Sequence, residues 1–209
     1  HPWGTCMANL ESIGRSIVQE APQTYIDVDI EADGIAGMGS ILSIGAVSPW
    51  GDEYYQELQP LYAHWIAGNQ EFCEQHGLQR DRLQTEGKDP LETITDFATW
   101  TNNIVQERGK TSAVFSAFNA SYNFPFIDLY TKEAGINNPY GVAGFCIKSL
   151  AMAAGASREL WDWKQTTKSR LLAELVPSGD FTHNALEDAR YQQKIHFRLA
   201  GLLSLHDVL

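Results

Sequence analysis

Residues 25–31 read Tyr-Ile-Asp-Val-Asp-Ile-Glu, and residues 41–47 read Ile-Leu-Ser-Ile-Gly-Ala-Val. The first stretch alternates apolar and polar side chains, as a strand with one buried face does. The glycine-rich segment between the two stretches is typical of a turn, so together they predict a β-hairpin. Because side chains alternate across a strand, Asp29 and Glu31 lie on the same face. The hairpin therefore carries a pair of neighbouring carboxylates.

The rest of the chain predicts three further strands and several helices. In chain order they are a strand at Tyr54–Leu58, an amphipathic helix with Ile94, Phe97, Ile104 and Val105 that ends near Gly109, a strand at Ser112–Phe118, a helix capped by Asn123, a short strand at Phe145–Ile147, a helix at Ser149–Ala154 and a last helix from about Ala185 to Leu205. A meander followed by alternating helices and strands is typical of a mixed sheet flanked by helices. We therefore expect an α/β fold with five strands.

Length and composition indicate one globular domain. The 209 residues are 44% hydrophobic, which is enough for a sizeable core. We expect this domain to span residues 8–209, and residues 1–7 to be a foreign remnant or a disordered N-terminus. The three cysteines lack metal-ligand spacing and predict free thiols. With no signal peptide and no membrane-spanning run, the chain predicts a cytoplasmic protein without a membrane partner.

The formal net charge is −11, which argues against a protein that coats long nucleic acid. It does not exclude a small cleft that binds a few nucleotides around metal ions, because the ions supply local positive charge.

A second group of polar residues precedes the last predicted helix. His183 lies just ahead of that helix, and Asp188 lies in its first turns. Carboxylates brought together from Asp29, Glu31 and Asp188 would suit hard cations such as Mg²⁺ or Mn²⁺. A histidine beside them would suit a base that activates water.

These segments resemble the motifs of the DEDDh, or DnaQ-like, 3′–5′ exonucleases of the ribonuclease H-like superfamily. The first motif is similar to Asp29-Ile30-Glu31-Ala32-Asp33-Gly34 followed by the strand that ends in Gly45-Ala46-Val47, and the third is similar to His183–Asp188. Asp27 is an alternative partner for Asp29, but only the Asp29/Glu31 register places Gly34 at the family's offset. The resemblance covers about residues 23–200.

The resemblance implies a two-metal active site. Asp29, Glu31 and Asp188 would hold the more tightly bound of two divalent cations, Mg²⁺ or Mn²⁺, and Asp29 would bridge to the second. His183 would deprotonate the water that displaces the terminal nucleotide as a 5′-monophosphate. The fold implied is a ribonuclease H-like mixed sheet of five strands.

One position departs from the family pattern. Asn123 stands where the second motif has an aspartate that helps to hold the second metal ion. An amide carries no charge and donates from one end, so it would weaken the second ion and reduce or abolish activity. Asp128 does not substitute, because it points elsewhere on the helix. Three explanations stand open: an engineered exchange, an asparagine native to a weakened enzyme or binding protein, and a plain helix cap.

Substrate contacts are predicted from the same motifs. The resemblance places Ser40, Ile41 and Leu42 against the terminal base and sugar, while core packing is the alternative for Ile41 and Leu42. Aromatic side chains at Phe124, Trp161 and Trp163 could stack on bases, with core packing as the favoured alternative for each of them. The basic stretch 148–170 could meet phosphates, with an ordinary solvated face as the alternative.

The leading hypothesis is a metal-dependent exonuclease that acts on single-stranded or frayed 3′ ends of DNA or RNA, including short oligonucleotides. The second is a non-catalytic module that retains the pocket and binds a nucleotide or a 3′ end. A third, weaker hypothesis is a proofreading subunit of a polymerase. A homodimer is compatible with each of them.

Overall fold

The computed structural model describes residues 2–155, 161–168, 170–175 and 181–206. Its centre is a five-stranded sheet in the order β3-β2-β1-β4-β5, which confirms the expected mixed sheet of a ribonuclease H-like fold. The hairpin strands β1 and β2 pair antiparallel, β3 adds to β2 antiparallel, and β4 and β5 run parallel to β1. The strands are β1 Thr24–Ala32, β2 Ile41–Val47, β3 Glu53–Glu57, β4 Ala113–Ala117 and β5 Gly144–Cys146.

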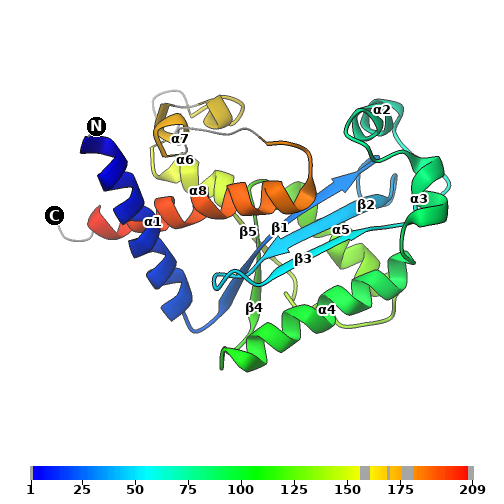
Figure 1. Ribbon diagram of the computed structural model, residues 1–209, viewed down its shortest axis with the longest axis horizontal. Coiled ribbons are helices and arrows are strands. Elements are labelled where there is room, and N and C mark those ends of the chain that lie inside the picture. The colour runs from blue at the N-terminus through cyan, green and yellow to red at the C-terminus, as the bar shows by residue number, and fades with distance from the viewer. Residues whose placement is uncertain (1, 156–160, 169, 176–180, 207–209) are drawn as a thin grey trace.

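Helices cover both faces of the sheet (Figure 1). In chain order the helical segments are α1 Pro2–Glu20, α2 Ala67–Gln75, α3 Arg80–Glu86, α4 Pro90–Glu107, α5 Ala120–Glu133, α6 Ile147–Ala153, the short 3-10 turn η1 Thr166–Lys168, α7 Arg170–Leu175 and α8 Ala185–His206. α4 and α5 pack on the face that carries Ile26, Val28 and Ile30. α8 lies on the other face with α1 and α6, and α2 and α3 lie beyond one end of the sheet.

The alternation predicted for β1 is present, and it separates the two faces chemically. Ile26, Val28 and Ile30 enter the main core, whereas Asp27, Asp29 and Glu31 belong to the α8 face. No helix in the described part of the chain has both the length and the apolar character needed to cross a bilayer.

Asp27, the alternative acid considered for the first motif, anchors α8 to the sheet. Its fully buried carboxylate accepts hydrogen bonds from Ser116 Oγ (2.8 Å) and Gln193 Nε2 (3.3 Å). His196 Nδ1 lies 3.1 Å from Asp27 Oδ1. A buried carboxylate is tolerated when its lone pairs are satisfied in this way. The role of Asp27 is therefore to hold α8 against the sheet.

Gln192 adds a second anchor from the same helix. Its fully buried amide donates to the Val28 carbonyl oxygen (2.8 Å) and accepts from the Phe118 backbone N–H (2.8 Å). One side chain of α8 is therefore bonded both to β1 and to the segment that joins β4 to α5.

The N-terminal helix α1 was not predicted. It packs along α8 at a close crossing, where Gly14 meets the backbone of Phe197 and Gly201 meets that of Leu10. Residues 2–7, expected to lie outside the domain, form the first turns of this helix. Their origin stays a prediction.

Gly45 allows the start of α8 to reach the sheet. It lies opposite Asp29 in the β1–β2 pairing, and a Cβ at this position would overlap the backbone of Ala185 and Leu186. The glycine in the second hairpin strand thus permits the close approach that brings Asp188 toward β1.

Gly45→Ala is expected to destabilise the protein by about 2 kcal/mol, because the added methyl group meets backbone that cannot move aside easily. For a domain of this size the melting temperature should fall by about 4–8 °C, measured by thermal denaturation. Gly68→Ala in α2, where a Cβ meets nothing within 4 Å, is the matched control. Equal melting temperatures for the two variants would contradict the close contact.

Candidate active site

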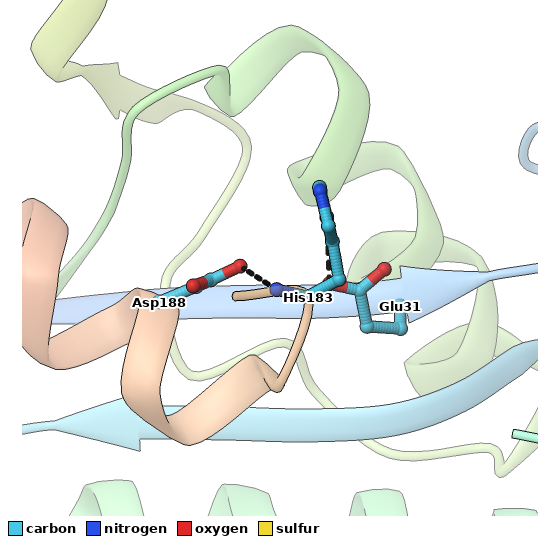
Figure 2. Close-up of side chains that lie close together, drawn as sticks. All are labelled: Glu31, His183 and Asp188. Atoms are coloured by element: carbon cyan, nitrogen blue, oxygen red, sulfur yellow. Dashed lines mark hydrogen bonds and ion pairs between the residues drawn. The ribbon is translucent and has the colours of Figure 1, made fainter. Parts of the chain in front are cut away.

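Three carboxylates converge where β1 meets the start of α8. Asp29 and Glu31 come from β1, and Asp188 comes from the first turn of α8. Asp188 is buried and accepts the backbone N–H groups of Thr182 (2.7 Å) and His183 (2.9 Å). These bonds fix the carboxylate, and Figure 2 shows it beside Glu31 and His183.

His183 lies immediately before α8, as predicted. The helix begins after Asn184, whose side chain accepts the N–H groups of Leu186 (3.2 Å) and Glu187 (3.1 Å), as an N-cap residue does. His183 has a left-handed backbone, with φ of 61°. This conformation is uncommon outside glycine but tolerated by histidine in turns, and it directs the ring toward Glu31, with Nδ1 3.9 Å from Oε1.

Burial raises the pKa values of all three carboxylates, and neighbouring charge adds to this for Asp29 and Glu31. Burial raises the pKa of Asp29 well above its ordinary value, and the charges of Glu31 and Asp188 raise it further. Burial, helped by the Asp188 charge, raises the pKa of Glu31 to about 7. Burial also raises the pKa of Asp188, although the hydrogen bonds from Thr182 and His183 oppose this. A nearby positive charge would favour the ionised forms of these three acids.

A divalent cation would supply such a charge. In the described part of the chain, no lysine or arginine forms an ion pair with Asp29, Glu31 or Asp188. Ligand atoms of Glu31, His183 and Asp188 all lie within 4.8 Å of one another. Oxygen donors held this closely suit Mg²⁺ or Mn²⁺. Glu31, His183 and Asp188 therefore form a group that can hold a metal ion. Asp29 lies near enough for the charges of Glu31 and Asp188 to raise its pKa.

In the absence of metal, the protein should lose stability as the pH rises. The pKa of Glu31 rises from 4.5 to about 7, so between these values the folded protein keeps a proton that the unfolded chain has released. The free energy of unfolding then falls with rising pH, by roughly 3 kcal/mol over this window. We expect the melting temperature in a chelator to fall from about pH 5 to about pH 8, and Mn²⁺ to restore it most at the higher pH.

Glu31→Gln is the control for this pH dependence, because it removes the titrating group without changing its shape. Its melting temperature in chelator should vary less across the same pH range. A metal-free protein whose stability rises between pH 5 and 8 would contradict the carboxylate cluster.

Asn123 lies beside the carboxylates and does not cap a helix. α5 begins at Ala120 after Asn119, so Asn123 occupies the end of the first turn, and the plain helix-cap explanation is wrong. Its buried amide Nδ2 donates to Asp29 Oδ1 (3.4 Å), and this bond lowers the pKa of Asp29. Asp128 pairs with Lys132 instead (2.6 Å), which agrees with its predicted direction.

The predicted substrate contacts are mostly not at the surface. Ser40, Ile41 and Leu42 are fully buried, which favours core packing, the alternative considered for Ile41 and Leu42. The β1–β2 turn before them instead exposes Ile35 and Met38. Both positions precede the strand, and nothing was predicted for them from the sequence, because an apolar strand gives a stronger pattern than a turn.

The turn that exposes these side chains is held in place. Asp33 is fully buried, pairs with Arg80 and accepts the Ser40 backbone N–H (2.6 Å). Tyr122 of α5 donates its hydroxyl to the Gly34 carbonyl oxygen (2.9 Å). The turn therefore has a fixed place between α3 and α5.

The aromatic and basic predictions have mixed outcomes. Phe124 is half-buried and packs edge-on to Phe115, with ring centroids 5.3 Å apart. Trp161 and Trp163 are exposed. Lys148 is buried with Nζ 4.2 Å from the Trp163 ring centroid, so this residue does not belong to a solvated face. Arg158 and the side chains of Lys168 and Arg170 lie outside the described residues, while Lys164 is exposed.

Two aromatic residues near His183 were not predicted. Phe72 and His76 of the α2 region have ring centroids 4.5 Å from that of His183. Burial, together with the charge of His76, lowers the pKa of His183, while Asp188 opposes this. The spacing of four residues between Phe72 and His76 is compatible with a helix. No capping residue marks where α2 begins, however, so the helix was not predicted.

Comparisons with known proteins agree with the fold. No protein-family model matches the chain. The 3′–5′ DNA exonuclease Cap18 of Escherichia coli is 34% identical over 185 residues, which cover 87% of this chain and 94% of that protein.

Solved structures of low sequence identity share the fold. The nuclease domain of 3′hExo, a DEDDh family member bound to rAMP, matches with a TM-score of 0.59 at 13% identity, covering 88% of this chain and 92% of that one. S. pombe Pop2p in its Mg²⁺- and Mn²⁺-bound form matches with a TM-score of 0.57 at 15% identity, covering 93% and 89%.

The chain therefore has the mixed five-stranded fold that 3′hExo and Pop2p share, with acidic side chains gathered at the junction of β1 and α8. Similarity to Cap18 over most of both chains makes the assignment more specific. The chain belongs to the DEDDh family of 3′–5′ exonucleases.

Proposed function

We propose that the protein is a metal-dependent 3′–5′ exonuclease that removes 5′-mononucleotides from single-stranded or frayed 3′ ends. The observation that carries this proposal is the grouping of Glu31, His183 and Asp188 within 4.8 Å. DNA is the first substrate to test, because Cap18 is a DNA exonuclease. RNA is the comparison.

The residues have distinct roles in this proposal. Asp29, Glu31 and Asp188 would hold two divalent cations, with Asn123 at the edge of the second. The cations, when bound, would supply positive charge at the reacting phosphate and lower the pKa of the attacking water. His183 would accept the proton from that water. Its side chain is 36% exposed, so its ring can reach solvent, and a histidine titrates near neutral pH.

Asn123 favours a second candidate function, a binding module that retains the pocket. Its N–H group occupies a lone pair of Asp29 Oδ1 that a metal ion would otherwise use. An amide at this position preserves the shape of the pocket while removing a charge. In this case the protein would bind a nucleotide or a 3′ end without cleaving it.

Product analysis separates the two candidates. A short 5′-labelled single strand of DNA is incubated with this chain in Mg²⁺ and in Mn²⁺, beside Asp188→Asn. The exonuclease should release 5′-mononucleotides from the 3′ end, more readily in Mn²⁺, and Asp188→Asn should release none. If neither this chain nor Asn123→Asp trims DNA or RNA while the strand still binds, the binding module is the correct reading.

A further inference from the structure

His183 is packed against two aromatic rings that no motif predicts. Its ring contacts Phe72 edge-on, with centroids 4.5 Å apart and planes at 79°, and His76 with centroids 4.5 Å apart at 64°. Phe72 and His76 also contact one another at 4.5 Å. The three rings therefore form one aromatic cluster, composed of Phe72, His76 and His183.

The two partners of His183 have fixed places. Phe72 and His76 are four residues apart, on one side of α2 and its C-cap. His76 Nδ1 lies 2.8 Å from the Phe72 carbonyl oxygen, and because a carbonyl only accepts, Nδ1 carries the proton. Cys73 of α2 belongs to a buried apolar cluster with Leu42, Leu78 and Leu83. This packing holds α2 in position.

His183, by contrast, has little else to orient its ring. The backbone N–H bonds to Asp188, but that bond does not involve the imidazole. Among the described residues, the ring's ion-pair partner is Glu31, whose Oε1 lies 3.9 Å from Nδ1, which is longer than a hydrogen bond. A side chain that is 36% exposed in a turn would otherwise rotate toward solvent.

We propose that Phe72 and His76 are positioning residues that hold the His183 imidazole over the carboxylates. The proposal rests on the proposed role of His183 as the base. A base must reach its proton within about 3 Å, so a ring that rotates freely spends less time in the reactive position. Aromatic edge-to-face packing restricts rotation without a hydrogen bond that would compete with water.

Nuclear magnetic resonance tests the placement of His183 directly. The ring protons of His183, assigned by their loss in His183→Ala, lie beside the face or edge of Phe72 and should be shifted by its ring current. Phe72→Ala should move these signals, and Gln75→Ala, an exposed change on the same helix, should not. Unchanged His183 signals in Phe72→Ala would overturn the proposal.

Kinetics in the Asn123→Asp background test whether the placement matters. Phe72→Ala should lower kcat about 10-fold with KM unchanged. Phe72→Tyr, which keeps an aromatic ring at this position, should retain most of the kcat. His76→Ala should act in the same direction, with His76→Phe as the conservative variant. The melting temperature should hardly change, because Phe72 is 40% exposed.

A double-mutant cycle excludes substrate contact as the cause. If Phe72 acts through His183, Phe72→Ala causes no further loss in a His183→Ala chain. A loss that persists there, or that is found in KM, would mean that Phe72 touches the nucleic acid and would overturn the proposal. Absence of nuclease activity in the Asn123→Asp chain would overturn the proposed function instead, and the ring signals would then decide the placement alone.

Discussion

Asn123→Asp is expected to increase the rate of 3′-end trimming in Mg²⁺ by about 100-fold, which corresponds to about 2.7 kcal/mol of activation free energy. The new carboxylate replaces an amide whose N–H points at Asp29 Oδ1. It therefore removes a donor from the side of Asp29 that would face a bound metal ion in the proposed site, and adds an acceptor. Initial rates on a 5′-labelled single strand measure the effect.

The same change should have a cost in the absence of metal. A fourth acid would join three carboxylates whose pKa values are already raised by burial. We expect the metal-free variant to melt at a lower temperature than the parent and to gain more from Mn²⁺.

Asn119→Asp is the matched control for this exchange. It makes the same chemical change one helical turn earlier, at the exposed cap of α5, and should leave the rate near that of the parent. Equal rates for Asn123→Asp and the parent in both Mg²⁺ and Mn²⁺ would contradict the view that position 123 limits activity.

His183→Ala is expected to lower the rate by about 10²- to 10⁴-fold in the Asn123→Asp background, as the loss of a general base does. Binding of Mn²⁺ and of single-stranded DNA should change much less. The backbone N–H of His183 still bonds Asp188 in the variant, so the carboxylate keeps its support. Single-turnover rates measure the first quantity, and titration calorimetry measures the second.

His183→Gly checks that backbone strain does not cause the loss. Glycine suits the left-handed conformation at this position, so this variant should fold at least as well as His183→Ala and be equally slow. An active His183→Gly protein would mean that the base lies elsewhere.

The sheet and the last helix could be predicted from the sequence because local signals there agree with the tertiary fold. Asp29 and Glu31 alternate with buried apolar residues, and the helix after Asn184 has a capping side chain. A segment can be predicted from the sequence where its local pattern agrees with its packing in the fold.

Other features depend on contacts that a single sequence does not display. α2 begins after Ile66 without a capping side chain, so its start has no signal, and Phe72 and His76 went unnoticed. The interpretation of Asn123 as a cap followed its propensity, but α5 starts one turn earlier. Ile41 and Leu42 lie in a strand that is buried throughout, and no alternation marked which face was covered.

The anchoring of α8 limits how this protein can evolve. Asp188 belongs to the acidic cluster at the start of the helix, while Gln192, Gln193 and His196 are bonded to the sheet further along. One inserted or deleted residue between Asp188 and Gln192 would turn the following segment by about 100°. Either the carboxylate or the anchors would then leave their places. Related sequences can vary their loops in length, but this spacing should stay constant.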